Sequence, residues 1–253
     1  MRLQRAALTV TSVLMAGALA GCGGSTGGNG TPASGAASSA TASSGSGADL
    51  SSLTAQQLLD KAKAELAAAK SFRVTGNAIS DGTAVAVDMG FTAAGSAGSV
   101  TLGGAKIELR SIGQTMYFRA PDSFWRKQLG GKADVVLAVV SGKWIKTSPT
   151  DPRYADLGSF TSRQQFIDTL QGDASAGQMV KTDGKTIDGV DCLGLKNADS
   201  ILYLAKDTAR PIAAEPVPGT KDVGQAKFSD YDAVPEVTAP PVAETIDATK
   251  LGG

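Results

Sequence analysis

Residues 83–93 read Thr-Ala-Val-Ala-Val-Asp-Met-Gly-Phe-Thr-Ala, and this stretch decides the fold class. Its large apolar residues fall on every second position: Val85, Val87, Met89 and Phe91. A second stretch repeats the alternation, because Ile107 and Leu109 stand between charged residues. A period of two places successive side chains on opposite faces of a strand. The pattern is typical of antiparallel strands with one covered face and one solvated face.

Strand-like segments recur on both sides of this stretch. Asp-Gly pairs at 81–82, 183–184 and 188–189 suit tight hairpin turns. We expect strands at 72–79, 83–93, 98–103, 105–112, 114–119, 143–147, 178–182, 185–187, 190–197, 200–205, 210–216 and 223–231. Strands and helices do not alternate regularly, so the pattern does not favour a parallel sheet.

Three segments have helical patterns. Thr54-Ala55-Gln56-Gln57 has the composition of a capping box and predicts a helix over 54–70. Residues 122–140 predict two short helices divided at Gly130-Gly131, and residues 159–170 predict a further helix capped by Ser159 or Thr161. Many antiparallel strands with few helices predict an α+β fold: a long curved antiparallel sheet with helices packed on its concave face.

The chain begins with a pattern that belongs to targeting. Arg2 and Arg5 precede an uncharged apolar segment, 6–19, which is shorter than the ~20 residues that a bilayer span needs. We therefore interpret residues 1–21 as a signal peptide. The ending Leu19-Ala20-Gly21-Cys22 resembles a bacterial lipobox. That resemblance implies cleavage before Cys22 and acylation of its thiol; the alternative is an ordinary secretory signal with an incidental cysteine.

Residues 23–48 contain only Gly, Ser, Thr, Ala, Asn and one Pro. Such a composition buries almost nothing and predicts a flexible coil. The expected organisation is therefore a signal peptide at 1–21, a lipidated cysteine with a flexible linker at 22–48, and a folded domain at 49–253.

The composition argues against several function classes. The formal net charge is +0, which provides no basic surface for nucleic acid. The chain has 0 His, which removes the Ser-His-Asp triad and the commonest metal ligand. Residues 49–253 contain neither a Gly-x-Ser-x-Gly nor a Ser-x-x-Lys motif. We therefore expect no catalytic residue, metal or cofactor; a hydrolase without a recognisable motif is the weakest alternative.

Cys192 is the second of 2 cysteines and lies in the strand expected at 190–197. With Cys22 acylated, it has no partner for an intramolecular disulfide. We expect it to be a small buried hydrophobic residue, the usual role of a free cysteine. A redox or lipid-attachment thiol is the alternative.

Three further stretches carry a family resemblance. They are Gly142-Lys143-Trp144-Ile145-Lys146, Leu202-Tyr203-Leu204-Ala205-Lys206-Asp207-Thr208 and the closing Lys227-Phe228-Ser229-Asp230-Tyr231-Asp232. Together with the order of elements, they resemble the actinobacterial LppX/LprAFG-type lipoproteins and their LolA/LolB-like relatives. The resemblance implies a half-barrel that encloses an apolar cavity between sheet and helices. Several proteins of this type carry lipids through the cell envelope.

On this basis, twelve apolar residues are candidates for contact with a ligand. The expected sheet wall comprises Val85, Val87, Met89, Phe91, Ile107 and Leu109. The expected helical lid comprises Phe124, Trp125, Val136, Val139, Phe166 and Leu170, with hinges at Gly130-Gly131 and Gly158. The alternative is that these residues simply form the core.

The sequence thus predicts a monomeric lipoprotein on the extracytoplasmic face of the cell membrane. It would bind an acyl-chain ligand, such as a lipid, a glycolipid or a lipidated molecule, and carry or present it. The alternative is a non-enzymatic lipoprotein with a filled core that binds a protein partner in signalling or envelope assembly. In that alternative, the partners of the protein would be the membrane, through the anchor, and an envelope protein.

A Cys22→Ala variant tests the anchor. Stable attachment to a membrane needs more than one acyl chain, and the acylated Cys22 would supply these chains. Removal of its thiol should therefore leave the protein uncleaved or release it from the membrane. Membrane fractionation and N-terminal sequencing measure both effects. Unchanged fractionation together with unchanged processing would contradict the lipobox interpretation.

Overall fold

The computed structural model describes residues 50–80, 82–170, 177–220 and 224–251. They belong to one compact unit, Gly45–Gly253. The signal peptide expected at 1–21, Cys22 and the linker expected at 22–48 lie outside the described residues. None of the helices in the described part is long and apolar enough to cross a membrane.

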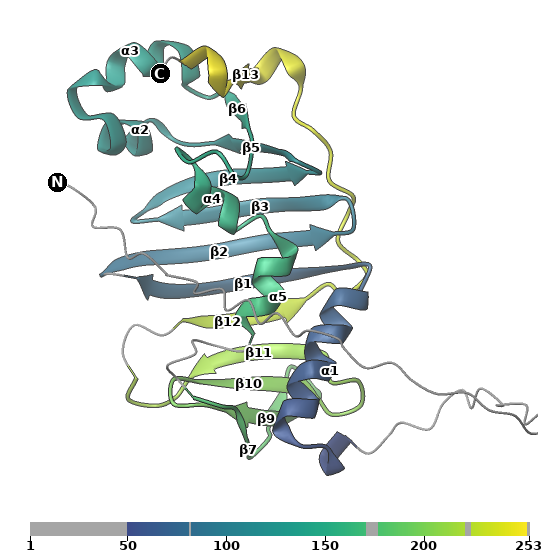
Figure 1. The fold of residues 1–253 in the computed structure, drawn as a ribbon. Helices are drawn as coiled ribbons and strands as arrows, with labels where there is room; N and C mark the ends of the chain where they lie inside the picture. The colour runs from purple at the N-terminus through teal and green to yellow at the C-terminus, as the bar shows by residue number, and fades with distance from the viewer. Residues whose placement is uncertain (1–49, 81, 171–176, 221–223, 252–253) are drawn as a thin grey trace, which may run out of the picture. The chain divides into compact units, whose positions relative to one another are not determined.

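The described strands form one open sheet (Figure 1). Its order is β13-β6-β5-β4-β3-β2-β1-β12-β11-β10-β9-β7, and β8 pairs with β9 outside this path. The strands are β1 (Ser71–Ser80), β2 (Thr83–Thr92), β3 (Gly95–Leu102), β4 (Ala105–Ile112), β5 (Thr115–Arg119), β6 (Trp144–Thr147), β7 (Val180–Thr182), β8 (Thr186–Ile187), β9 (Val190–Lys196), β10 (Ser200–Ala205), β11 (Pro211–Pro216), β12 (Gln225–Ser229) and β13 (Thr245–Asp247).

The α+β prediction is confirmed, and all twelve expected strands are present with small shifts at their ends. One strand was not predicted. β13 pairs with β6 in parallel, with Thr245 opposite Trp144, so the sheet is mixed at this edge. Its three residues, Thr-Ile-Asp, are too few to show an alternation. The pairing arises because the C-terminal segment returns to β6, which local sequence does not reveal.

The expected N-terminal helix is α1 (Ala55–Ala68), and its capping box is confirmed. The Thr54 hydroxyl accepts from the Gln57 backbone N–H at 3.2 Å, and the Gln57 side chain accepts from the Thr54 N–H at 2.8 Å. The helix buries one face, made of Leu58, Leu59, Ala62 and Leu66. It lies beside α5 (Arg163–Thr169) and β7 (Figure 1).

Residues 122–140 form the expected pair of short helices. α2 (Asp122–Leu129) and α3 (Ala133–Val140) are joined by a 3-10 turn, η2 (Gly130–Lys132). Gly130 has a φ of 56°, a conformation that glycine adopts at little cost. Trp125 packs on Phe118 of β5, with ring centroids 5.9 Å apart. The α2–α3 pair therefore covers the β5–β6 end of the sheet (Figure 1).

The second insertion contains α4 (Ala155–Ser159) and α5. Both predicted caps, Ser159 and Thr161, are wrong: the cap of α5 is Ser162, whose side chain accepts from the Gln165 N–H at 3.2 Å. Ser159 and Thr161 instead donate their hydroxyls to the Asp156 and Gly158 carbonyls, both at 2.7 Å. These two hydroxyls bind carbonyls within α4, and Ser162 is left to cap α5.

Gly158 is a site of close packing. A Cβ at this position would lie 2.0 Å from the Pro149 carbonyl oxygen. The glycine therefore lets two backbone segments approach each other closely. This contact argues against the expected hinge at Gly158, because motion there would break the packing.

Cys192 is buried, as expected, with 6 % of its surface exposed. It clusters with Tyr203 and Ala213, apart from the main core. Its thiol donates to the Val190 carbonyl at 3.3 Å, and burial raises its pKa above the ordinary value. A buried thiol with a raised pKa forms little thiolate, so its environment is that of a structural cysteine.

A Thr54→Ala variant tests the capping box. Loss of the hydroxyl leaves the Gln57 N–H without its side-chain partner, which should lower the free energy of unfolding by about 1 kcal/mol. In a domain of this size that corresponds to a melting temperature lower by about 2–4 °C. Thr54→Ser keeps the acceptor and serves as the control. Equal melting of the alanine and serine variants would show that the cap contributes nothing.

Candidate ligand-binding cavity

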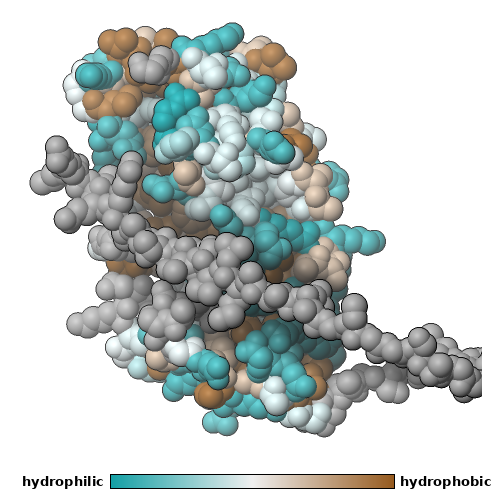
Figure 2. Space-filling view, in the orientation of Figure 1, coloured by the Kyte–Doolittle hydropathy of each residue, from teal (hydrophilic) through white to brown (hydrophobic). Residues whose placement is uncertain are grey.

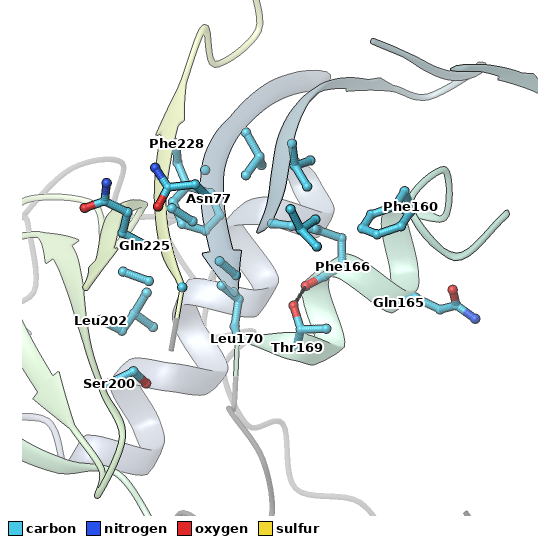
Figure 3. A pocket seen from close by; sticks show the side chains of 18 of the residues that line it. Asn77, Phe160, Gln165, Phe166, Thr169, Leu170, Ser200, Leu202, Gln225 and Phe228 are labelled. Carbon is cyan, nitrogen blue, oxygen red and sulfur yellow. Dashed lines mark hydrogen bonds between the residues drawn. The ribbon is translucent and has the colours of Figure 1, made fainter. Parts of the chain in front are cut away.

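A cavity of about 760 Å³ lies between the sheet and the second helical insertion (Figure 3). Strands β1, β2, β10, β11 and β12 supply its floor, and α4 and α5 supply its roof. The lining residues are Val74, Gly76, Asn77, Ala78, Val85, Val87, Ser159, Phe160, Gln165, Phe166, Thr169, Leu170, Met179, Ser200, Leu202, Ala214, Gly224, Gln225, Ala226 and Phe228.

The floor is built on one row of residues that crosses five strands. In order from β2 to β10 the row is Val87, Gly76, Ala226, Ala214 and Leu202. Each residue is the direct partner of the next, so the five side-chain positions share one face of the sheet. The three central residues have a methyl group or no side chain at all. The small residues leave space above the middle of the row.

The neighbouring row closes this space on one side. It contains Met89, Val74 and Phe228, which are direct partners across β2, β1 and β12. All three are buried. Moving two residues along the strands therefore changes the floor from small to large side chains, and this change sets the boundary of the cavity.

The roof is apolar and partly aromatic. Phe160, Phe166 and Leu170 come from α4–α5 and lie across from the strand residues (Figure 3). The Phe166 ring lies 5.9 Å from the Phe228 ring and 5.5 Å from the Phe91 ring, measured between centroids. Phe166 therefore ties the roof to the closed side of the floor. The Thr169 hydroxyl donates to the Phe166 carbonyl at 2.6 Å.

No charged residue occurs among the described residues that line the cavity. Its polar members carry hydroxyl or amide groups: Asn77, Ser159, Gln165, Thr169, Ser200 and Gln225. Asn77 and Gln225 are direct strand partners that alternate with Gly76 and Ala226, and both are exposed, so their amides point away from the cavity floor (Figure 3). The Gln165 side chain points away from the strands. The cavity is therefore an uncharged, mainly apolar site.

Four of the twelve predicted residues line this cavity. They are Val85 and Val87 on the floor and Phe166 and Leu170 on the roof. Met89, Phe91, Ile107 and Leu109 face the same side of the sheet but are fully buried in the core. They lie under tightly packed side chains and do not reach the cavity.

The four predicted lid residues of α2–α3 lie elsewhere. Phe124 and Trp125 pack against each other and the core, with ring centroids 5.4 Å apart. Val136 is half-buried against the core, whereas Val139 is 53 % exposed. The two insertions therefore cover different parts of one sheet, and only α4–α5 roofs the cavity.

The sequence reasoning missed most of the floor. Gly76, Ala78, Ala214 and Ala226 were not singled out because small residues give no hydrophobic signal. Their meaning depends on register, since Gly76 and Ala226 are 150 positions apart in sequence yet direct partners in the sheet. The available signal was the small residue at an inward position in each of the three expected strands 72–79, 210–216 and 223–231.

Three aspartates in or beside turns serve the structure rather than form a carboxylate pair. Asp151 accepts from Arg153 at 2.9 Å, which holds its pKa below the ordinary range. Asp188 occupies a turn with a φ of 49°, and Asp191 accepts from the Thr186 hydroxyl at 2.8 Å. Within the described residues no group of His, Cys, Asp and Glu is placed to hold a metal ion.

No family model matches this chain, and no curated protein matches it. Among solved structures it is similar to LprF from Mycobacterium bovis, at 15 % identity and a TM-score of 0.45, over 74 % of this chain and 96 % of that one. Lipoprotein LppX from Mycobacterium tuberculosis is 13 % identical with a TM-score of 0.40, over 72 % and 99 %. A LolA superfamily protein from Nitrosomonas europaea is 14 % identical with a TM-score of 0.27, over 70 % and 92 %. These are protein types that the sequence resemblance names.

A Gly76→Ala variant tests the close approach at the cavity floor. A Cβ at Gly76 would lie 2.4 Å from the Gln225 carbonyl oxygen, so β1 and β12 would have to move apart. We expect a loss of about 1–3 kcal/mol in the free energy of unfolding, the usual cost of overpacking. Gly131→Ala is the matched control, because a Cβ there meets nothing within 4 Å. Urea denaturation measures both; equal stability of the two variants would contradict the contact.

Proposed function

We propose that this protein is a non-enzymatic envelope lipoprotein that binds an acyl-chain ligand in the α4–α5 cavity and carries or presents it. The observation that carries the proposal is the row Val87, Gly76, Ala226, Ala214 and Leu202 beneath an apolar roof. The volume of the cavity, about 760 Å³, falls within the ~300–1,000 Å³ typical of ligand pockets. A lipid, a glycolipid and a lipidated molecule all present the required chain.

Burial of methylene groups supplies the affinity. Each buried CH₂ contributes about 0.8 kcal/mol, so ten methylenes would contribute about 8 kcal/mol before the cost of association. This attraction has no direction and needs no polar recognition. An uncharged lining suits such a chain, because a charged group without a partner would be costly to bury.

The half-buried apolar residues favour this function over the filled-core alternative. Val87 and Phe166 belong to the inner side of the fold, yet both are only partly buried because no side chain of the described residues fills the space between floor and roof. In a filled core, inner residues of this size would be enclosed, as Met89 and Phe91 are. The partly buried inner residues therefore favour the carrier over the partner-binding function.

The anchor completes the proposal. Acylation of Cys22 would attach the protein to the extracytoplasmic face of the cell membrane, and the residues 23–48 would tether the folded domain to it. A linker of this length and composition has a mean reach of roughly 25–30 Å. The proposed ligand would thus be captured close to the bilayer from which it comes.

Ala226→Leu tests the cavity. The added side chain would fill the centre of the floor and should weaken binding of a fluorescent fatty acid about ten-fold or more, since it displaces several methylenes. Ala86→Leu is the matched control, because Ala86 lies on the exposed face of β2, which β1 separates from β12. Thermal melting verifies that both variants fold.

Because none of the described lining residues is ionisable, the affinity of an uncharged fluorescent lipid should not change between pH 5 and pH 8.

Native mass spectrometry of the purified protein provides the second measurement. Copurified lipid in the wild type and its loss in Ala226→Leu support the carrier. If the wild type neither retains lipid nor binds the probe, the carrier function fails and the partner-binding function replaces it.

A further inference from the structure

An apolar surface stands at the end of the fold that holds α3 and β13. Of five exposed large hydrophobic residues among those described, three lie here. Val135 is 79 % exposed and Val139 is 53 % exposed, both on α3, and Val242 of η4 (Val242–Glu244) is 90 % exposed. The Lys143 ammonium donates to the Ala243 carbonyl at 3.4 Å, which places η4 beside the end of α3. Figure 2 shows hydrophobic side chains gathered at this end. We call Val135, Val139 and Val242 the valine tip.

Helix α3 is apolar on two sides. Ala133, Leu137 and Val140 face inward and are buried. Val135 and Val139 are four residues apart, so they are neighbours on the outward side. A surface helix normally carries polar residues there. The outward valines contribute nothing to the core of the described fold, so they call for another explanation.

The surroundings of the valine tip are basic. Residues 122–147 contain five basic side chains, Arg126, Lys127, Lys132, Lys143 and Lys146, against two acidic ones, Asp122 and Asp134, in a chain of net charge +0. Residues 242–251 add Lys250, Glu244 and Asp247, so the two segments together hold six basic and four acidic side chains. Asp134 is paired with Arg126 at 2.7 Å, and Asp122 accepts from the Ser141 hydroxyl at 2.8 Å. No ion pair between described residues includes Lys127, Lys132 or Lys143.

We propose that the valine tip docks on an anionic lipid bilayer. Valines would enter the interfacial region, and the lysines around them would meet the acidic headgroups. Apolar side chains flanked by Lys and Arg form the combination by which surface elements bind such membranes. A second copy of the chain fits less well, because a symmetric contact would bring the same lysines against each other. This contact is separate from the acyl anchor and from the cavity, and it would fix how the folded domain is oriented on the membrane.

A fluorescence experiment on the full-length protein in lipid vesicles tests the proposal. Val139→Cys carries an environment-sensitive label, and the vesicles contain lipids with a nitroxide quencher in the interfacial region. We expect quenching about three-fold or more above that of a label at Ala86→Cys, on the exposed face of β2, when the vesicles contain phosphatidylglycerol. The parent chain, treated with the same label, gives the background from Cys22 and Cys192.

Reversing the charge of two lysines distinguishes docking on an anionic membrane from binding of the valine tip to another partner. Lys127→Glu with Lys132→Glu should abolish the excess quenching at position 139, and pure phosphatidylcholine vesicles should show little of it. Equal quenching at positions 139 and 86 would overturn the proposal. Quenching at position 139 that does not change with lipid charge or with the two substitutions would overturn it as well. A shift of the label without vesicles that grows with protein concentration would instead indicate self-association and would also overturn it.

The proposed function and this inference can fail separately. Ala226→Leu should lose the fluorescent fatty acid and keep the quenching at position 139, because the cavity and the valine tip share no residue. Melting curves show that each variant is folded before it is compared.

Discussion

The pairing of β1 with β12 is the constraint on which the rest of the structure depends. It joins the strands from β2 to β6 to the strands from β11 to β7, so that one sheet runs through both halves of the chain. The partners are distant in sequence, as Arg73 and Ser229 illustrate. Gly76 permits the close approach, because even a single methyl group would meet the Gln225 carbonyl. We call the β1–β12 pairing the seam; without it the floor of the cavity would be divided between two separate sheets.

Side groups around the seam hold it closed. The Tyr231 hydroxyl donates to the Pro211 carbonyl at 2.6 Å, and burial raises the pKa of this tyrosine above its ordinary value. Asp232 accepts from the Lys70 backbone N–H at 2.7 Å and pairs with Arg210. The residues that follow β12 therefore bind to the entry of β1 and to the start of β11. Long-range pairing is costly in chain entropy, and these contacts offset part of that cost.

The two helical insertions divide the work of covering the sheet. α4–α5 lies over small residues and leaves a cavity, whereas α2–α3 lies over large ones, such as Phe118, and closes the core. The two insertions also differ in their proposed roles: α4–α5 roofs the ligand cavity, and α3 carries part of the valine tip that docks on the membrane. An apolar cavity suits a flexible chain, and an exposed apolar tip among lysines suits a charged interface. A protein that takes its ligand from a membrane would use both surfaces at once.

The local pattern of the sequence determined the elements, and the tertiary structure decided which of them form a site. Alternation in 83–93, the capping box at Thr54 and the Gly130-Gly131 break each depend on neighbours in the chain, and all three appear in the structure as predicted. Whether an apolar residue lines a cavity depends on what stands opposite it. Val87 borders the space because its row continues into Gly76 and Ala226, whereas Met89, two residues on, is packed against Val74. Val139 was predicted to face a ligand and is exposed instead, because the position of α3 on the sheet is set by contacts that no local pattern records.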